Sequence, residues 1–92
     1  MKDDAFYKRA DEHIKLSNNQ IQKDIPLGEI GASMMYSTAR FNAWMNAYSC
    51  ENSIEMQVKR TETVNYFMEE YRKMLNENLD EYIENFEAYM KK

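Results

Sequence analysis

Small and apolar side chains recur every three or four residues near the start of the chain. The members of this stripe are Phe6, Ala10, Ile14, Ser17 and Ile21. Steps of this length place side chains on one side of a helix, which we expect over about residues 3–22. Either Asp3 or Asp4 is expected to cap its first turn, because a carboxylate accepts hydrogen bonds from the unpaired backbone amides there.

The one proline and both glycines of the chain fall within residues 26–31. Turn residues confined to one place favour few, long elements, and we expect a second helix over about residues 29–48, with Pro26 as an alternative start. This helix is nearly uncharged, since Arg40 is the one charged residue between Ile30 and Cys50. Bulky apolar residues mark one face and alanines the other, which predicts burial on both faces and a central place in the fold.

A third stripe of apolar residues keeps one phase from Ile54 to Met90. At its start, Asn52 and Glu55 resemble a capping box in which asparagine replaces serine or threonine. We therefore expect a third helix over about residues 53–76.

An unbroken helix along the whole stripe would be about 55 Å long, more than a small domain needs. We expect a break at residues 76–78 and a fourth helix over about residues 79–91. If the helix is instead continuous, its far end must cover its aromatic side chains with a second chain, because an apolar face left in water contributes little stability. These side chains are Tyr82, Phe86 and Tyr89.

The predicted elements give an all-α fold, a small three- or four-helix bundle-like domain around the central, nearly uncharged helix. An apolar fraction of 43% and a charged fraction of 30% are typical of a folded globular chain, which excludes disorder. We expect one domain over residues 1–92.

The net charge of −4 is unevenly placed, with five acids against two lysines in residues 77–92. We interpret this acidic run as a solvated helix face, with a basic partner as the alternative. The absence of a lysine and arginine stripe excludes nucleic-acid binding. The chain has no apolar stretch of about 18 to 20 residues and no signal-peptide core after Met1, so we expect a cytoplasmic protein without membrane contact.

Side chains that commonly carry chemistry are few. Cys50 is the one cysteine and His13 the one histidine, so a structural zinc site lacks ligands and no disulfide can form within the chain. We interpret His13 as a core or boundary residue rather than a base or metal ligand. Cys50 is expected to be unreactive, because Glu51 beside it disfavours the thiolate. We expect no catalytic residue, no metal and no cofactor.

Arg40 is the strongest candidate for recognition. A buried guanidinium must find an acceptor, and we expect a structural pair with Glu62, Glu69 or Glu70. The alternative is a small pocket for an acidic ligand. The candidate contact residues for a ligand or partner are Tyr36, Arg40, Asn42, Trp44 and Asn46.

A polar strip runs beside the apolar face of the same helix. Its members are Thr38, Asn42, Asn46 and Ser49. Such a strip can orient a ligand, but we expect it to form hydrogen bonds with backbone groups or with water between packed helices.

Five stretches of the sequence resemble a known family. They are FY at 6–7, RAD at 9–11, MYSTARFNA at 35–43, YRKML at 71–75 and NLDEYIENF at 78–86. Over about residues 6–90, the chain resembles the short proteobacterial proteins grouped as domain of unknown function family 3144, most specifically around Arg40. The resemblance implies a bacterial cytoplasmic protein and transfers no catalytic residue.

Two classes of function remain open at this point. The one that we favour is a protein-interaction or regulatory module that acts as a symmetric homodimer, with a different protein partner as a variant of it. The competing class is a small acidic-ligand-binding protein, or an enzyme, with a pocket around Arg40. A carboxylate beside Arg40 favours the first, and an open cavity favours the second.

Overall fold

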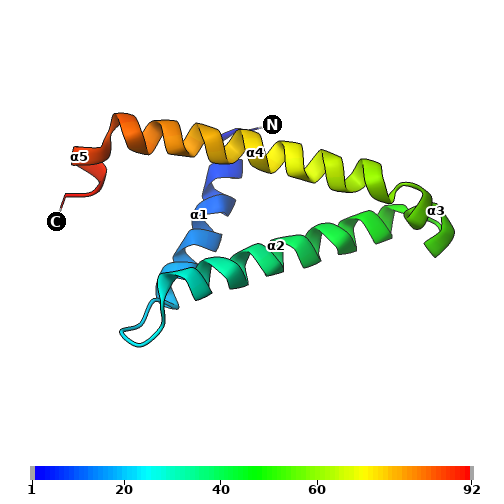
Figure 1. Ribbon diagram of the computed structural model, residues 1–92, viewed down its shortest axis with the longest axis horizontal. Coiled ribbons are helices and arrows are strands. Elements are labelled where there is room, and N and C mark those ends of the chain that lie inside the picture. The colour runs from blue at the N-terminus through cyan, green and yellow to red at the C-terminus, as the bar shows by residue number, and fades with distance from the viewer. Residues whose placement is uncertain (1, 92) are drawn as a thin grey trace. The chain divides into compact units, whose positions relative to one another are not determined.

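The computed structural model of the chain describes residues 2–91, which form five α-helices and no strand (Figure 1). The helices are α1 (Asp4–Asn19), α2 (Leu27–Ser49), α3 (Ser53–Val58), α4 (Arg60–Glu84) and α5 (Phe86–Tyr89). The all-α class expected from the sequence is confirmed. The chain divides into two compact units, Met1–Met45 and Asn46–Lys92. That residues 1–92 form a single domain stays a prediction.

Helix α1 begins as the sequence predicts and ends earlier than expected. The Asp3 side chain caps it by accepting a hydrogen bond from the Phe6 amide at 2.9 Å. At the other end, the Gln20 amide donates to the Ser17 carbonyl at 3.0 Å. Hydrogen bonds to the third preceding residue tighten and close a last turn, so the helix ends at Asn19 rather than near residue 22.

Helix α2 follows a loop of residues 20–26 and begins directly after Pro26. The Pro26 carbonyl accepts a hydrogen bond from the Glu29 amide at 3.0 Å. Proline suits this position because the first amides of a helix have no partner in the helix, and the missing N–H therefore costs nothing. The helix thus begins at Leu27, between the two expected starts at Pro26 and Glu29.

Helices α1 and α2 pack against each other near the loop that joins them. Ile30 is 8% exposed and is the one buried residue within residues 2–91. Next to this contact, the Ser17 hydroxyl of α1 donates a hydrogen bond to the Met34 sulfur of α2 at 3.5 Å. Burial in the first unit is therefore concentrated where the two helices meet.

The expected burial of α2 on both faces is wrong for the single chain. Apart from Ile30, no residue of this helix is buried, and the Tyr36 and Phe41 side chains are exposed. The nearly uncharged surface that suggested burial is thus present, but the residues of one chain do not cover it.

The second unit opens with the capping arrangement expected at Asn52. The Asn52 side chain accepts a hydrogen bond from the Glu55 amide at 2.9 Å, and the Glu55 carboxylate accepts one from the Glu51 amide at 2.7 Å. The Lys59 ammonium lies 3.1 Å from the same carboxylate. The Glu51 hydrogen bond is the main reason that the pKa of Glu55 is lowered, and Lys59 lowers it further.

The expected break at residues 76–78 is absent, because α4 runs through it without interruption. The Asn78 side chain donates a hydrogen bond to the Met74 carbonyl of its own helix at 2.7 Å. An asparagine that bonds back in this way does not cap a new helix. The interruptions lie instead at Lys59 and Asn85, where the backbone departs from helical angles.

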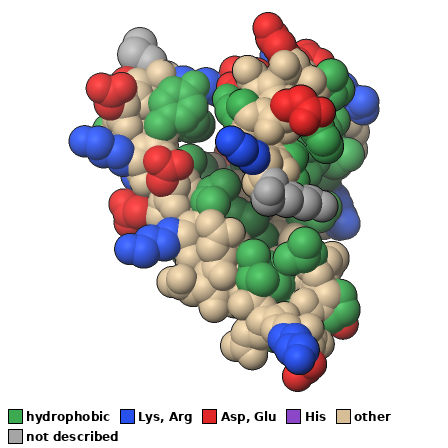
Figure 2. All heavy atoms as spheres, turned by 90° about the vertical axis from the view of Figure 1, so that its left-hand side faces the viewer, with side chains coloured by type: hydrophobic (Ala, Val, Ile, Leu, Met, Phe, Trp, Pro, Cys, Tyr) green, Lys and Arg blue, Asp and Glu red, His purple; other side chains and the backbone are tan. Residues whose placement is uncertain are grey.

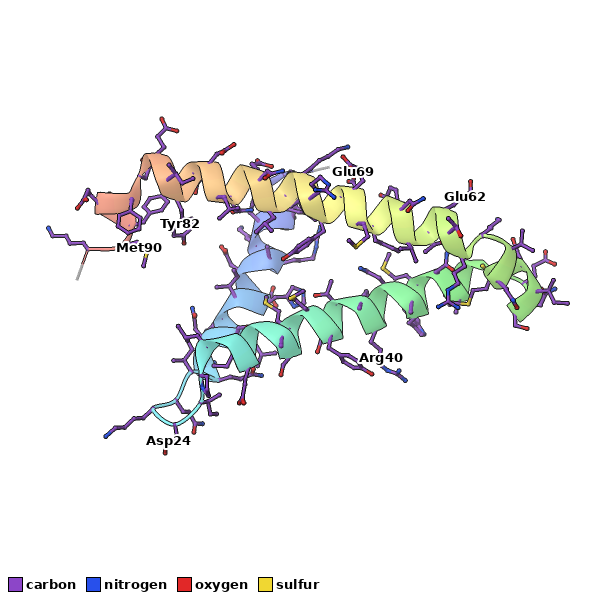
Figure 3. The ribbon with its side chains drawn as sticks, in the orientation of Figure 1. Asp24, Arg40, Glu62, Glu69, Tyr82 and Met90 are labelled. Carbon is purple, nitrogen blue, oxygen red and sulfur yellow. The ribbon has the colours of Figure 1, made fainter. Side chains whose placement is uncertain are left out.

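Helix α5 is a single turn after Asn85, and its aromatic side chains reach back to α4. Tyr82 and Tyr89 pack edge to face, with ring centroids 5.0 Å apart, and Tyr82 and Met90 lie close together in Figure 3. The Tyr89 hydroxyl donates to the Glu81 carboxylate at 3.2 Å. This carboxylate raises the pKa of Tyr89 above its ordinary value, because its negative charge disfavours a second one on the phenol.

Truncation of Ile30 tests the packing of α1 on α2. We expect Ile30→Ala to lower the free energy of unfolding by about 2 kcal/mol, the lower end for a buried isoleucine, because the site lies beside open solvent. Leu16→Ala is the matched control, since Leu16 is 59% exposed and its loss should cost less than about 0.5 kcal/mol. Urea unfolding followed by circular dichroism at one fixed protein concentration measures both, and equal losses would contradict the packing described.

The Glu55 cluster predicts a pH dependence of stability. Because the folded chain lowers the pKa of Glu55 below 4.5, its contribution is fully present above that value and is lost as the pH falls through the lowered pKa. The melting temperature of Glu55→Gln should therefore lie below that of the unsubstituted chain at neutral pH and approach it as the pH falls below the lowered pKa. Glu12→Gln, in the exposed part of α1, is the control and should show no such convergence.

Candidate functional site

Three of the five candidate contact residues lie along one side of α2. Tyr36, Arg40 and Trp44 are spaced four residues apart, which places them one above the other on a helix. All three side chains are exposed, and Figure 3 shows that of Arg40 projecting away from the helix. Trp44 packs against Phe41, with ring centroids 5.5 Å apart. This side of α2 is an open surface rather than a pocket.

The other two candidates lie on a different side of the same helix. Asn42 comes two residues after Arg40, a step that turns the helix by about 200°, and Asn46 follows one turn later. Both are half-buried. The structure therefore does not bring the five candidate residues together, and no single small ligand can contact all of them on α2.

Two members of the polar strip of α2 form hydrogen bonds with backbone groups of their own helix. The Thr38 hydroxyl donates a hydrogen bond to the Met34 carbonyl at 2.9 Å, and the Ser49 hydroxyl donates to the Asn46 carbonyl at 2.9 Å. Serine and threonine hydroxyls in helices commonly bond to the preceding turn in this way. These two side chains need no ligand to complete their hydrogen bonds.

Arg40 is exposed, so its charge is solvated and does not require a partner in the way a buried guanidinium would. Two of the acids expected to pair with it have neighbours in their own helix. Glu69 lies 3.7 Å from Arg72, and Glu70 lies 3.4 Å from Lys73. A pair between Arg40 and an acid of α4 stays a prediction.

An open hollow of about 330 Å³ lies at the junction of α1, the loop and α2. Its lining is formed by Asn19, Gln20, Gln22, Ile25, Glu29, Ile30 and Ser33. None of the five candidate contact residues belongs to it. Sequence reasoning missed this hollow because its lining comes from α1, the loop and α2, and no single periodicity reveals which side chains of three segments meet.

The hollow carries one charged side chain, that of Glu29. A carboxylate repels an acidic ligand, and no arginine or lysine lines the hollow to offset it. The hollow therefore does not supply the pocket for an acidic ligand that the sequence suggested as an alternative.

The residues singled out for chemistry stand alone. His13 is exposed on α1, and Cys50 is a half-buried free thiol just after α2. Over residues 2–91, no group of three or more histidine, cysteine, aspartate or glutamate side chains is placed to hold a metal ion. In the same range, no helix has the length and apolar character needed to cross a membrane.

Exposed apolar side chains are the most prominent feature of the surface. Figure 2 shows hydrophobic side chains gathered on the face in view, among charged ones. On α4, apolar residues of the predicted stripe are 43 to 73% exposed, and no residue of that helix is buried. Large apolar areas on a protein surface mark sites of interaction, so the candidate functional site is a surface rather than a cavity.

The comparisons with known proteins identify the family of the chain. Residues 6–83 match the family described as Protein of unknown function (DUF3144). The NMR structure of the protein NB7890A from Shewanella sp. is similar, with a TM-score of 0.81 and 44% sequence identity over 97% of this chain and 94% of that one. No curated protein matches the chain. The chain belongs to the DUF3144 family of proteins of unknown function, as the stretch around Arg40 indicated.

Proposed function

We propose that this protein is a protein-interaction or regulatory module that acts in the cytoplasm as a homodimer. The observation that carries the proposal is the exposure of its apolar side chains. Within residues 2–91, Ile30 alone is buried, although 43% of the chain is apolar. Amphipathic helices draw most of their stability from covered apolar faces, so a second molecule is the natural cover.

The accessible surface supports a partner of substantial size. The chain exposes 8810 Å², whereas a folded monomer of 11.1 kDa exposes about 5,700 Å². The excess of about 3,000 Å² per chain amounts to about 6,000 Å² over two copies, which is on the scale of the largest obligate homodimer interfaces, about 5,000 Å² or more over both partners. A small ligand covers far less.

The continuity of α4 gives a second, independent argument. The sequence predicts that an unbroken helix must cover its far end with a second chain, and α4 is unbroken as far as Glu84. Tyr82, Phe86 and Tyr89 are each about half exposed. Aromatic residues are enriched at protein interfaces because each buries a large area at little cost in side-chain entropy.

The competing function receives no comparable support. The five candidate contact residues lie on different sides of α2, and the hollow beside Ile30 carries an acid. A pocket that recognises an acidic ligand needs a base directed into it. Homodimerisation is therefore the function that the geometry favours.

Sedimentation equilibrium tests the proposal directly. At micromolar concentration we expect a mass of about 22 kDa, twice the 11.1 kDa of one chain. Because a dimer is stabilised by mass action, its melting temperature should also rise with protein concentration. A mass of 11.1 kDa, together with a melting temperature that is independent of concentration, would overturn the proposal.

A further inference from the structure

The apolar side of α4 forms a continuous strip that we call the α4 face. It consists of Val64, Met68, Tyr71, Leu75, Leu79 and Tyr82, all of them 43 to 58% exposed. Steps of three and four residues keep these side chains on one side of a helix about 37 Å long. No residue of α4 is buried, so the chain described provides no complete cover for this face.

The charges of the region are distributed unequally along the helix. The N-terminal end carries Lys59 and Arg60 against a single acid, Glu62, whereas the C-terminal end carries four acids and no base. The acids are Glu77, Asp80, Glu81 and Glu84. If a second helix with the same charges runs in the opposite direction, the basic end of each helix lies beside the acidic end of the other.

A row of residues beside the α4 face, which we call the flanking column, also has charges that match those of an oppositely directed copy. Every seventh residue gives Arg60, Phe67, Met74 and Glu81, which lie on one flank of a helix that pairs with another. When a second copy of this column runs in the opposite direction, an acid lies opposite a base at each end. In the middle, one apolar residue lies opposite another. A column that complements its own reversed sequence is what a symmetric antiparallel pair requires.

We infer that the α4 face binds the α4 face of a second copy of this chain in an antiparallel pair, an inference that rests on the homodimer proposed above. Arg60 lies beside Glu81 of the second copy, and Phe67 lies beside Met74 of the second copy. In the same register, Met68 meets Tyr71 and Val64 meets Leu75 across the interface. Each contact occurs twice, because the two copies are related by a two-fold axis.

The polar residues of α4 support this register. Thr61 lies opposite Asn78 of the second copy, near each end of the apolar layers. A polar pair among apolar layers disfavours slipped alignments, because a slip would set each polar group against an apolar one. Asn78 donates to the Met74 carbonyl, and its side-chain oxygen remains able to accept from the threonine hydroxyl.

Other occupants of the α4 face fit the charges less well. A parallel pair would place the acidic ends of the two helices together, which is unfavourable. Helix α2 has Glu29 and Arg40 as its charged residues and cannot match charges at both ends of α4. These two arrangements are the alternative outcomes of the test.

Disulfide trapping in the full chain separates the alternatives. In a Cys50→Ser background, Val64→Cys with Leu75→Cys should oxidise to a covalent dimer, because the two positions meet across the antiparallel interface. The single variants Val64→Cys and Leu75→Cys are the controls and should stay uncrosslinked, since their own copies lie about 16 Å apart along the axis. A parallel pair would also cross-link the single variants, and a face covered by α2 would yield no covalent dimer.

Charge reversal tests the flanking column in solution. At low salt, Arg60→Glu should raise the dissociation constant of the dimer about tenfold, and Arg60→Glu with Glu81→Arg should restore it to within about threefold. Lys73→Glu is the matched control, because it makes the same change in net charge on the side of α4 away from the face. Its dissociation constant should change less than about threefold.

The outcomes separate this inference from the proposed function. If the unsubstituted chain sediments as a monomer, the homodimer and the α4 pairing both fail. If it sediments as a dimer while the double charge reversal gives no rescue and the cysteine pair does not cross-link, the antiparallel pairing alone is overturned.

Discussion

An isolated helix of ordinary composition is marginal in water, and in proteins most of its stability comes from covering its apolar face. Each long helix of this chain therefore needs a cover for its apolar face. It has three long helices with bulky apolar stripes, yet Ile30 is the one buried residue in the range described. Local hydrogen bonds, such as those of the Asp3 cap and the Glu55 cluster, fix where helices begin, but they contribute far less stability than a covered apolar face. The main stabilisation has to come from surfaces that are still open.

The helices and their class were predictable because their signals are local. The stripe of α1, the asparagine that caps α3 and the unchanged phase from Ile54 onward each involve residues within a few turns of one another. The break at residues 76–78 was wrong for a reason equally local. An asparagine can cap a new helix or bond back to the preceding turn, and the sequence contains no signal that separates the two. The actual interruptions, at Lys59 and Asn85, involve small changes of backbone angle that periodicity does not register.

The candidate site was harder to predict, since it depends on what lies beside α2 rather than on α2 itself. An uncharged helix suggests burial, and burial suggests that Arg40 must be paired. The inference from an uncharged helix to a buried one is wrong, because both sides of α2 are largely exposed in one chain. The five candidate residues then divide between different sides of the helix. The hollow formed by the loop of residues 20–26 was not predictable, because no pattern in the sequence joins its lining.

The near absence of charge on α2 has a kinetic consequence. Charged surfaces attract partners over about 10 Å at moderate salt and accelerate their encounter. Helix α4, with bases at one end and acids at the other, can orient an approaching molecule before contact. Helix α2 has no such field along most of its length, so whatever binds there is selected after collision, by shape and short-range hydrogen bonds. Association through α4 is therefore expected to depend on ionic strength, whereas association through α2 is not.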